Sequence, residues 1–140
     1  MKALQAYQQQ DTPNWSRIDM LIAAFDGVTS RLKKAGDHLK KNEELKAQVL
    51  LVRAQRIICE LYAGLNLEHG EIPKNMRRIY LFVLSCIGLG DKLNLEAAID
   101  AMSTIRSGFV DIREESVRLE RSGAGHTVER EPTTLVGAIG

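Results

Sequence analysis

The chain has 140 residues, 44% of them hydrophobic and 26% charged, and its formal net charge is +1. This length favours one domain with a single core. The near-neutral charge gives no indication of binding to nucleic acid or to an acidic membrane. The densest apolar stretch, residues 79–89, is too short to span a bilayer, and the N-terminus lacks the apolar run of a secretory signal. We therefore expect a cytoplasmic protein without membrane insertion.

The first half of the chain predicts a polar arm and two amphipathic helices. Residues 1–15 are rich in glutamine and form the expected arm. Ser16 can cap a first helix that ends near Lys41, and Asn42 can cap a second. Apolar residues recur at helical spacing in both segments. The positions are Ile18, Leu21, Ile22, Phe25, Val28 and Leu32 in the first helix, and Leu45, Val49, Val52, Ile57, Leu61 and Leu65 in the second.

The second half predicts two further helices and a tail. Pro73 suits the first turn of a third helix, which ends at residues 88–91. The fourth helix is expected from Asn94 to about Leu119. Four helices joined by short loops predict an all-α fold, an antiparallel up-and-down four-helix bundle over residues 16–120. Residues 121–140 are rich in glycine, serine and threonine and predict a flexible tail. Alternatively, Leu135, Val136 and Ile139 dock on an apolar groove of the bundle.

No pattern in the sequence indicates catalysis. The three histidines stand in different segments without a metal-binding partner at helical spacing, and no phosphate-binding or dinucleotide motif occurs. Cys59 and Cys86 are too few and too far apart for a zinc site or a disulfide framework, so we expect both to be small core residues. We predict a protein that is not an enzyme and needs no metal or cofactor.

Two surface features bear on binding. A basic cluster lacks the interleaved aromatic residues that stack on bases, which favours a solvated helix face over a nucleic-acid site. Its members are Arg31, Lys33, Lys34, Lys40, Lys41 and Lys46. The apolar runs at residues 50–52 and 81–84 are wider than a strict two-in-seven seam. These runs either cover a broad core or form a groove for an amphipathic partner helix.

Four motifs in order resemble the flagellin export chaperone (FliS) family, from Ala6 to about Ile112. The first is the tyrosine segment at residues 6–8, and the second is the apolar and Phe-Asp-Gly pattern of residues 16–27. The third covers residues 54–61 with Leu65-Asn66. The fourth is the glycine turn of residues 70–76 with Ile79-Tyr80.

The chain departs from the family pattern at several positions. Arg17 stands where the family usually has proline, Phe25 replaces tyrosine, Asn66 replaces aspartate, and Phe109 stands where a tryptophan often closes the fourth helix. Both aromatic replacements keep a large ring. The glycine-rich tail has no counterpart in the family pattern. These differences suggest a divergent member with a variant flagellin as its client.

The resemblance implies a four-helix bundle that binds the disordered C-terminal segment of flagellin, prevents its polymerisation and helps deliver it to the flagellar type III export gate. Flagellin and export-gate components are thus the expected partners, and no nucleic acid is expected. A regulatory bundle that sequesters a different protein is the alternative. The residues expected to bind the client are Tyr7, Ile22, Phe25, Ile58, Leu61, Leu65, Ile79 and Tyr80. For each of them a plain core role is an equal alternative.

Overall fold

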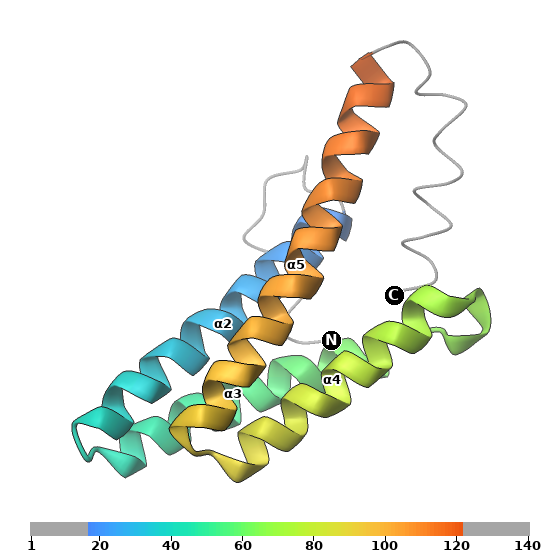
Figure 1. Ribbon diagram of the computed structural model, residues 1–140. Helices are drawn as coiled ribbons and strands as arrows, with labels where there is room; N and C mark the ends of the chain where they lie inside the picture. The colour runs from blue at the N-terminus through green and yellow to red at the C-terminus, as the bar shows by residue number, and fades with distance from the viewer. Residues whose placement is uncertain (1–16, 122–140) are drawn as a thin grey trace.

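The computed structural model describes residues 17–121, which form four α-helices and one short 3-10 helix, without a strand in this range. Successive helices run in opposite directions (Figure 1), which confirms the predicted antiparallel four-helix bundle. The predicted arm and all but the first residue of the predicted tail lie outside the described residues. The elements are α2 (Arg17–Lys40), α3 (Glu44–Ala63), η1 (Leu67–His69), α4 (Glu71–Leu89) and α5 (Lys92–Arg121).

The turn between α2 and α3 is closed by charged side chains. Asn42 adopts a positive φ of 60° and Glu43 is the residue that precedes the first turn of α3, so the predicted cap at Asn42 is wrong by one residue. The Glu43 carboxylate accepts a hydrogen bond from Lys46 at 2.9 Å and lies 3.1 Å from Nδ1 of His38. These two hydrogen bonds, with that from Lys46 first, lower the pKa of Glu43 to about 2.

The boundaries of α4 and α5 follow from three residues. Pro73 lies in the first turn of α4, where its missing N–H leaves no helical bond unmade. Gly90 ends α4 in the left-handed conformation, with φ 69°, and its N–H donates to the carbonyl of Cys86. The Asp91 side chain accepts a hydrogen bond from the backbone N–H of Asn94 at 3.4 Å. The fourth helix therefore begins at Lys92, two residues before the predicted start.

The core of the bundle is built around α2. Phe25, Val28 and Leu32 of this helix are fully buried, and α2 packs most extensively on α3 and then on α5. The rings of Phe25 and Phe109 meet across α2 and α5 with centroids 5.6 Å apart and planes tilted by 51°. Tilted ring pairs of this kind contribute about 0.5–1.5 kcal/mol beyond their area burial. The aromatic residue at position 109 thus joins the first and last helices of the bundle.

Two ion pairs also join α2 to α5. Arg106 donates from Nε to Oδ1 of Asp26 at 2.6 Å and from a second nitrogen to Oδ2 at 3.4 Å, a two-pronged contact. Seven residues earlier in α2, Asp19 pairs with Arg113, which lies seven residues later in α5. We call these two contacts the α2–α5 ion-pair ladder. Its seven-residue spacing fixes the register of two antiparallel helices.

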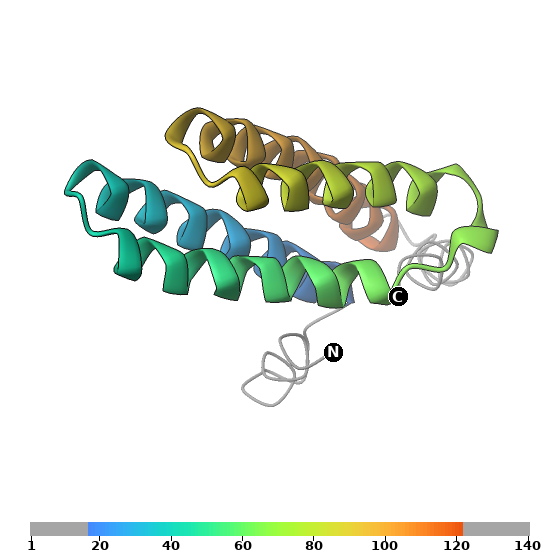
Figure 2. The ribbon, with the colours of Figure 1, turned by 90° about the horizontal axis from the view of Figure 1, so that it is seen from below.

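The α3–α4 contact is the sparsest between neighbouring helices of the bundle. Viewed from below, α3 and α4 form one side of the bundle, with α2 and α5 behind them (Figure 2). The 30 residues of α5 span about 45 Å and the 19 residues of α4 about 28 Å, at 1.5 Å per residue. The C-terminal turns of α5 accordingly extend past the other helices in Figure 1.

Two predictions about burial are wrong. Leu45, Val49 and Val52 were expected on the core stripe of the second helix, but they are exposed, Leu45 to 84%. The buried positions of α3 are instead Ala47, Leu51, Ala54, Ile57, Ile58 and Leu61. Ala47 and Ala54 turn the small-residue side of α3 towards its neighbours and allow close packing. Leu45, Val49 and Val52 lie on another side of the helix and remain in solvent. Cys59 is likewise exposed, whereas Cys86 is buried as expected.

Tyr80 carries the most unusual polar atom of the core. Its side chain is fully buried, and its hydroxyl has no hydrogen-bond partner among the described residues. Burial alone raises the pKa of this phenol far above its usual range, so the group stays neutral. A buried hydroxyl without a partner carries a desolvation cost of about 1–3 kcal/mol.

We expect Tyr80→Phe to raise the free energy of unfolding by about 1 kcal/mol, because the substitution removes the unpartnered oxygen and keeps the ring. Urea unfolding followed by circular dichroism measures the change. The conservative control is Tyr62→Phe, since Tyr62 is solvent-exposed and its hydroxyl can bond to water. A loss of stability in Tyr80→Phe would show that the hydroxyl has a partner in the full chain.

A double-mutant cycle on Asp26→Ala and Arg106→Ala is expected to give a coupling of about 0.5–1 kcal/mol, the upper part of the range for an exposed pair, because the contact is two-pronged. Thermal unfolding of the four proteins measures it. The coupling should shrink in high salt, which screens exposed charges. Coupling of zero at low salt would contradict a stabilising role for the pair.

Candidate protein-binding surface

The residues predicted to bind the client fall into three groups. Phe25, Ile58 and Tyr80 are fully buried and Leu61 is nearly so, and all four belong to the hydrophobic core. Three others are half-buried and pack at the edge of that core. Tyr7 lies outside the described residues. The half-buried group comprises Ile22, Leu65 and Ile79.

These positions have different access to a partner. Ile22 lies in α2, Leu65 in the loop after α3 and Ile79 in α4, and each exposes part of its side chain, so a partner can touch them without any rearrangement. The four buried residues face the interior, where they are available only if neighbouring helices separate. The α3–α4 contact is the sparsest, and Ile58 and Tyr80 belong to these two helices. Their role in client binding stays a prediction.

The exposed apolar surface is concentrated on one half of the bundle. Among the described residues, the large hydrophobic side chains that are exposed lie on α3, η1 and α4, with one further leucine at the start of α5 and none on α2. They are Leu45, Val49, Val52, Tyr62, Leu67, Ile72, Leu81, Phe82, Leu89 and Leu93. Large exposed apolar patches mark surfaces that contact a partner, whereas single exposed apolar side chains are ordinary.

The sequence signalled part of this surface. The apolar runs at residues 50–52 and 81–84 predicted a surplus, and Val52, Leu81 and Phe82 are indeed exposed. Leu51 and Val83, from the same runs, are buried in the core. Leu89 was missed because it lies in the helix-ending segment, and Leu93 because it precedes the predicted fourth helix. Their flanking glycine, Gly90, could have shown that the segment is a turn exposed to solvent.

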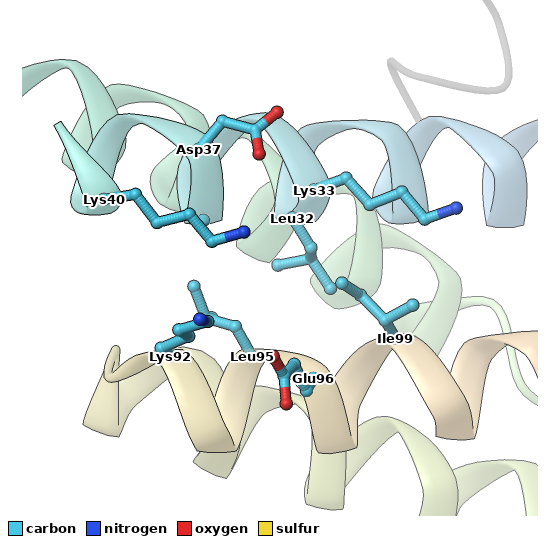
Figure 3. Close-up of a pocket in the computed structure, with 9 residues that line it drawn as sticks. Leu32, Lys33, Asp37, Lys40, Lys92, Leu95, Glu96 and Ile99 are labelled. Atoms are coloured by element: carbon cyan, nitrogen blue, oxygen red, sulfur yellow. The ribbon is translucent and has the colours of Figure 1, made fainter.

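A pocket lies between the C-terminal half of α2 and the start of α5 (Figure 3). Its volume is about 280 Å³. Leu32, Leu95 and Ile99 form its apolar floor, and Gly36 leaves room above it because no side chain projects there. The charged residues around it are Lys33, Asp37, Lys40, Lys92 and Glu96.

The basic cluster, which extends from α2 through the following turn into α3, is divided among several local contacts. Arg31 donates to the carbonyl of Gly27 at 3.0 Å, and Lys46 pairs with Glu43. Lys33 and Lys40 line the pocket described above. Local contacts at Arg31 and Lys46 thus occupy part of the cluster, and the interpretation of a solvated face stays a prediction.

Within residues 17–121, no group of three or more histidine, cysteine or acidic side chains is arranged to hold a metal ion. None of the described helices is long and apolar enough to cross a membrane. The chemistry that the described surface offers is apolar contact on α3 and α4 and charge at the pocket.

Comparison with known proteins identifies the family. Searches of curated proteins and of solved structures give no match. A model of the family described as flagellar protein FliS matches residues 1–116. This range includes all four motifs of the sequence and α2, α3, η1 and α4 with most of α5. Since the match covers well over half of the 140 residues, the chain belongs to the flagellar protein FliS family.

Proposed function

We propose that this protein is a flagellar secretion chaperone that binds the C-terminal segment of flagellin on the apolar surface of α3 and α4. Membership of the FliS family supports a flagellar chaperone role. Through this binding the protein keeps flagellin from polymerising in the cytoplasm and assists its delivery to the flagellar type III export apparatus. The observation that carries the proposal is the concentration of exposed apolar side chains on α3, η1 and α4.

The physical character of this surface suits a disordered client. A segment that folds on binding has an ordering cost, so its affinity must come from apolar anchors rather than from scattered polar contacts. Leu81, Phe82 and Leu89 on α4 offer aliphatic and aromatic area to such anchors. Ile79 and Leu65, which are half-buried, extend that area towards the core. An amphipathic helix laid along this face buries its own apolar stripe against these side chains.

The sparse α3–α4 contact offers a route by which the buried residues Ile58 and Tyr80 contact the client. If a client helix separates α3 from α4, Ile58 and Tyr80 become reachable, and the unpartnered hydroxyl of Tyr80 gains access to a hydrogen-bond acceptor. The core then exchanges contacts between helices of the bundle for contacts with the client. In this proposal Phe25 and Leu61 retain their core positions.

Calorimetric titration with the C-terminal peptide of the flagellin from the same organism tests the proposal. We expect saturable one-to-one binding with a negative heat-capacity change, the mark of apolar burial. The double substitution Leu81→Ser with Phe82→Ser should weaken binding at least about tenfold, which corresponds to about 1.4 kcal/mol. Because both residues are exposed, the melting temperature should change little.

The matched control is Leu93→Ser, which removes a more exposed leucine at the start of α5. This variant should bind as the unchanged protein does. Equal loss in the control and in the α4 variant would contradict the assignment of the surface to α4. Absence of binding by the folded full-length protein would contradict flagellin as the client and favour a regulatory bundle with another partner.

A further inference from the structure

The α2–α5 ion-pair ladder predicts which residues of α2 lie opposite which residues of α5 further along the two helices. Its pairs, Asp19 with Arg113 and Asp26 with Arg106, advance by seven residues in α2 and retreat by seven in α5. Another step of seven brings Lys33 opposite Ile99, and one more brings Lys40 opposite Lys92. All four of these residues line the same pocket, which confirms that the register continues.

The last step of this register places two positive charges where the first two steps pair opposite charges. Lys40 and Lys92 extend towards one another from α2 and α5 (Figure 3), and neither forms an ion pair with any described residue. Asp37 and Glu96 belong to the same pocket, yet their carboxylates point away from the space between the two lysines in Figure 3. Because the three lysines of the pocket outnumber its two acidic residues, the space between Lys40 and Lys92 suits an anionic group.

The space beneath the two lysines is apolar. Leu32 and Leu95 are almost completely buried and Ile99 packs partly against the core, so the floor of the pocket consists of aliphatic side chains. The volume of about 280 Å³ lies just below the range for small-molecule sites, which begins at about 300 Å³. A pocket of this size and lining matches one or two amino-acid side chains better than a cofactor.

We propose that this pocket binds an acidic segment of a partner protein. One aliphatic side chain of the segment enters the cavity and packs on the partly exposed Ile99, directly above the buried Leu32 and Leu95. A neighbouring carboxylate lies between Lys40 and Lys92. The bound carboxylate completes the α2–α5 ion-pair ladder at the end where the chain supplies two lysines. The pocket lies on the α2–α5 side of the bundle, and the site does not depend on flagellin binding to α3 and α4.

Methyl NMR of the full-length protein, titrated with a capped pentapeptide of sequence Asp-Glu-Leu-Glu-Asp, tests the inference. We expect the methyl signals of Leu32, Leu95 and Ile99 to shift in a saturable way. The shifts should weaken as salt is added, because the attraction is between exposed charges. Replacing the central leucine of the peptide by alanine, or its acids by their amides, should remove most of the effect.

Variants of the protein distinguish binding in the pocket from attraction to the overall charge of the protein. Lys40→Glu and Lys92→Glu each place a carboxylate opposite the remaining lysine. This carboxylate occupies the position of the peptide's own acid, so each variant should lower the affinity for the peptide about tenfold. The matched control is Lys34→Glu with Lys41→Glu, which changes charge on exposed positions of the same segment outside the pocket. The control should keep at least about half of the affinity, because its charges are distant and screened.

Three results would overturn the proposal. One is the absence of methyl shifts at Leu32, Leu95 and Ile99 with millimolar peptide. Another is an equal loss of binding in the control and in Lys40→Glu, which would reduce the effect to overall charge. The third is an equal response to inorganic phosphate alone, which would show a site for anions in general and no role for the apolar floor.

Discussion

The bundle depends on covering the apolar face of α2 from two sides. Ala24, Phe25, Val28, Leu32 and Ala35 are completely buried, and two different helices, α3 and α5, supply the cover. The alanines permit close approach, and Phe25 fills the interface with α5 against Phe109. Since α2 and α5 are the first and last helices, their pairing closes the bundle. The loops then need only to hold α3 and α4 at its other side.

This arrangement separates the surfaces available for binding. The α2–α5 side is fixed by ring contact and by charge, so the pocket at its end has a defined shape. On the α3–α4 side the helices touch sparsely and retain exposed apolar residues, and this is the side to which we assign the client in our proposal. In our proposal the exposed residues of α3 and α4 contact the client first, and the core residues are reached only when the two helices separate. Among the predicted site residues of these helices, Ile58, Leu61 and Tyr80 belong to the core.

Much of the fold could be predicted from the sequence because its signals are local. Helical periodicity, Pro73 and the turn at Gly90 defined the helices to within a few residues. The face of α3 was harder to predict. Its Leu45, Val49 and Val52 form a regular stripe, but its Ala47 and Ala54 form another, and which stripe turns inwards depends on how closely α2 approaches. That distance is set by tertiary packing, which a single helix does not encode.

The burial of the candidate site residues could not be predicted from the sequence for the same reason. The family motifs led to Phe25, Ile58, Leu61 and Tyr80, which are large apolar residues in the right segments, but a pattern of residue types does not distinguish an interior ring from a surface anchor. The partner of Asp26 was not predictable either, since Arg106 is 80 residues away in the chain. Only the packed bundle brings these two residues together. The same packing sets the register of α2 against α5 that places Lys40 opposite Lys92.

Cys59 and Cys86 differ in exposure, and this difference provides a way to follow opening of the bundle by thiol reactivity. Cys59 is on the outer face of α3 and meets solvent in the folded state, whereas Cys86 is in the core near Asp91, and burial first and that carboxylate second raise the pKa of its thiol. Thiol reagents attack the thiolate, which is scarcer at a raised pKa and shielded by burial. A chromogenic thiol reagent should therefore modify one sulfur at once and the other only as fast as α4 leaves its neighbours. The rate of the slow phase therefore measures the rate at which the bundle opens, without any added label or substitution.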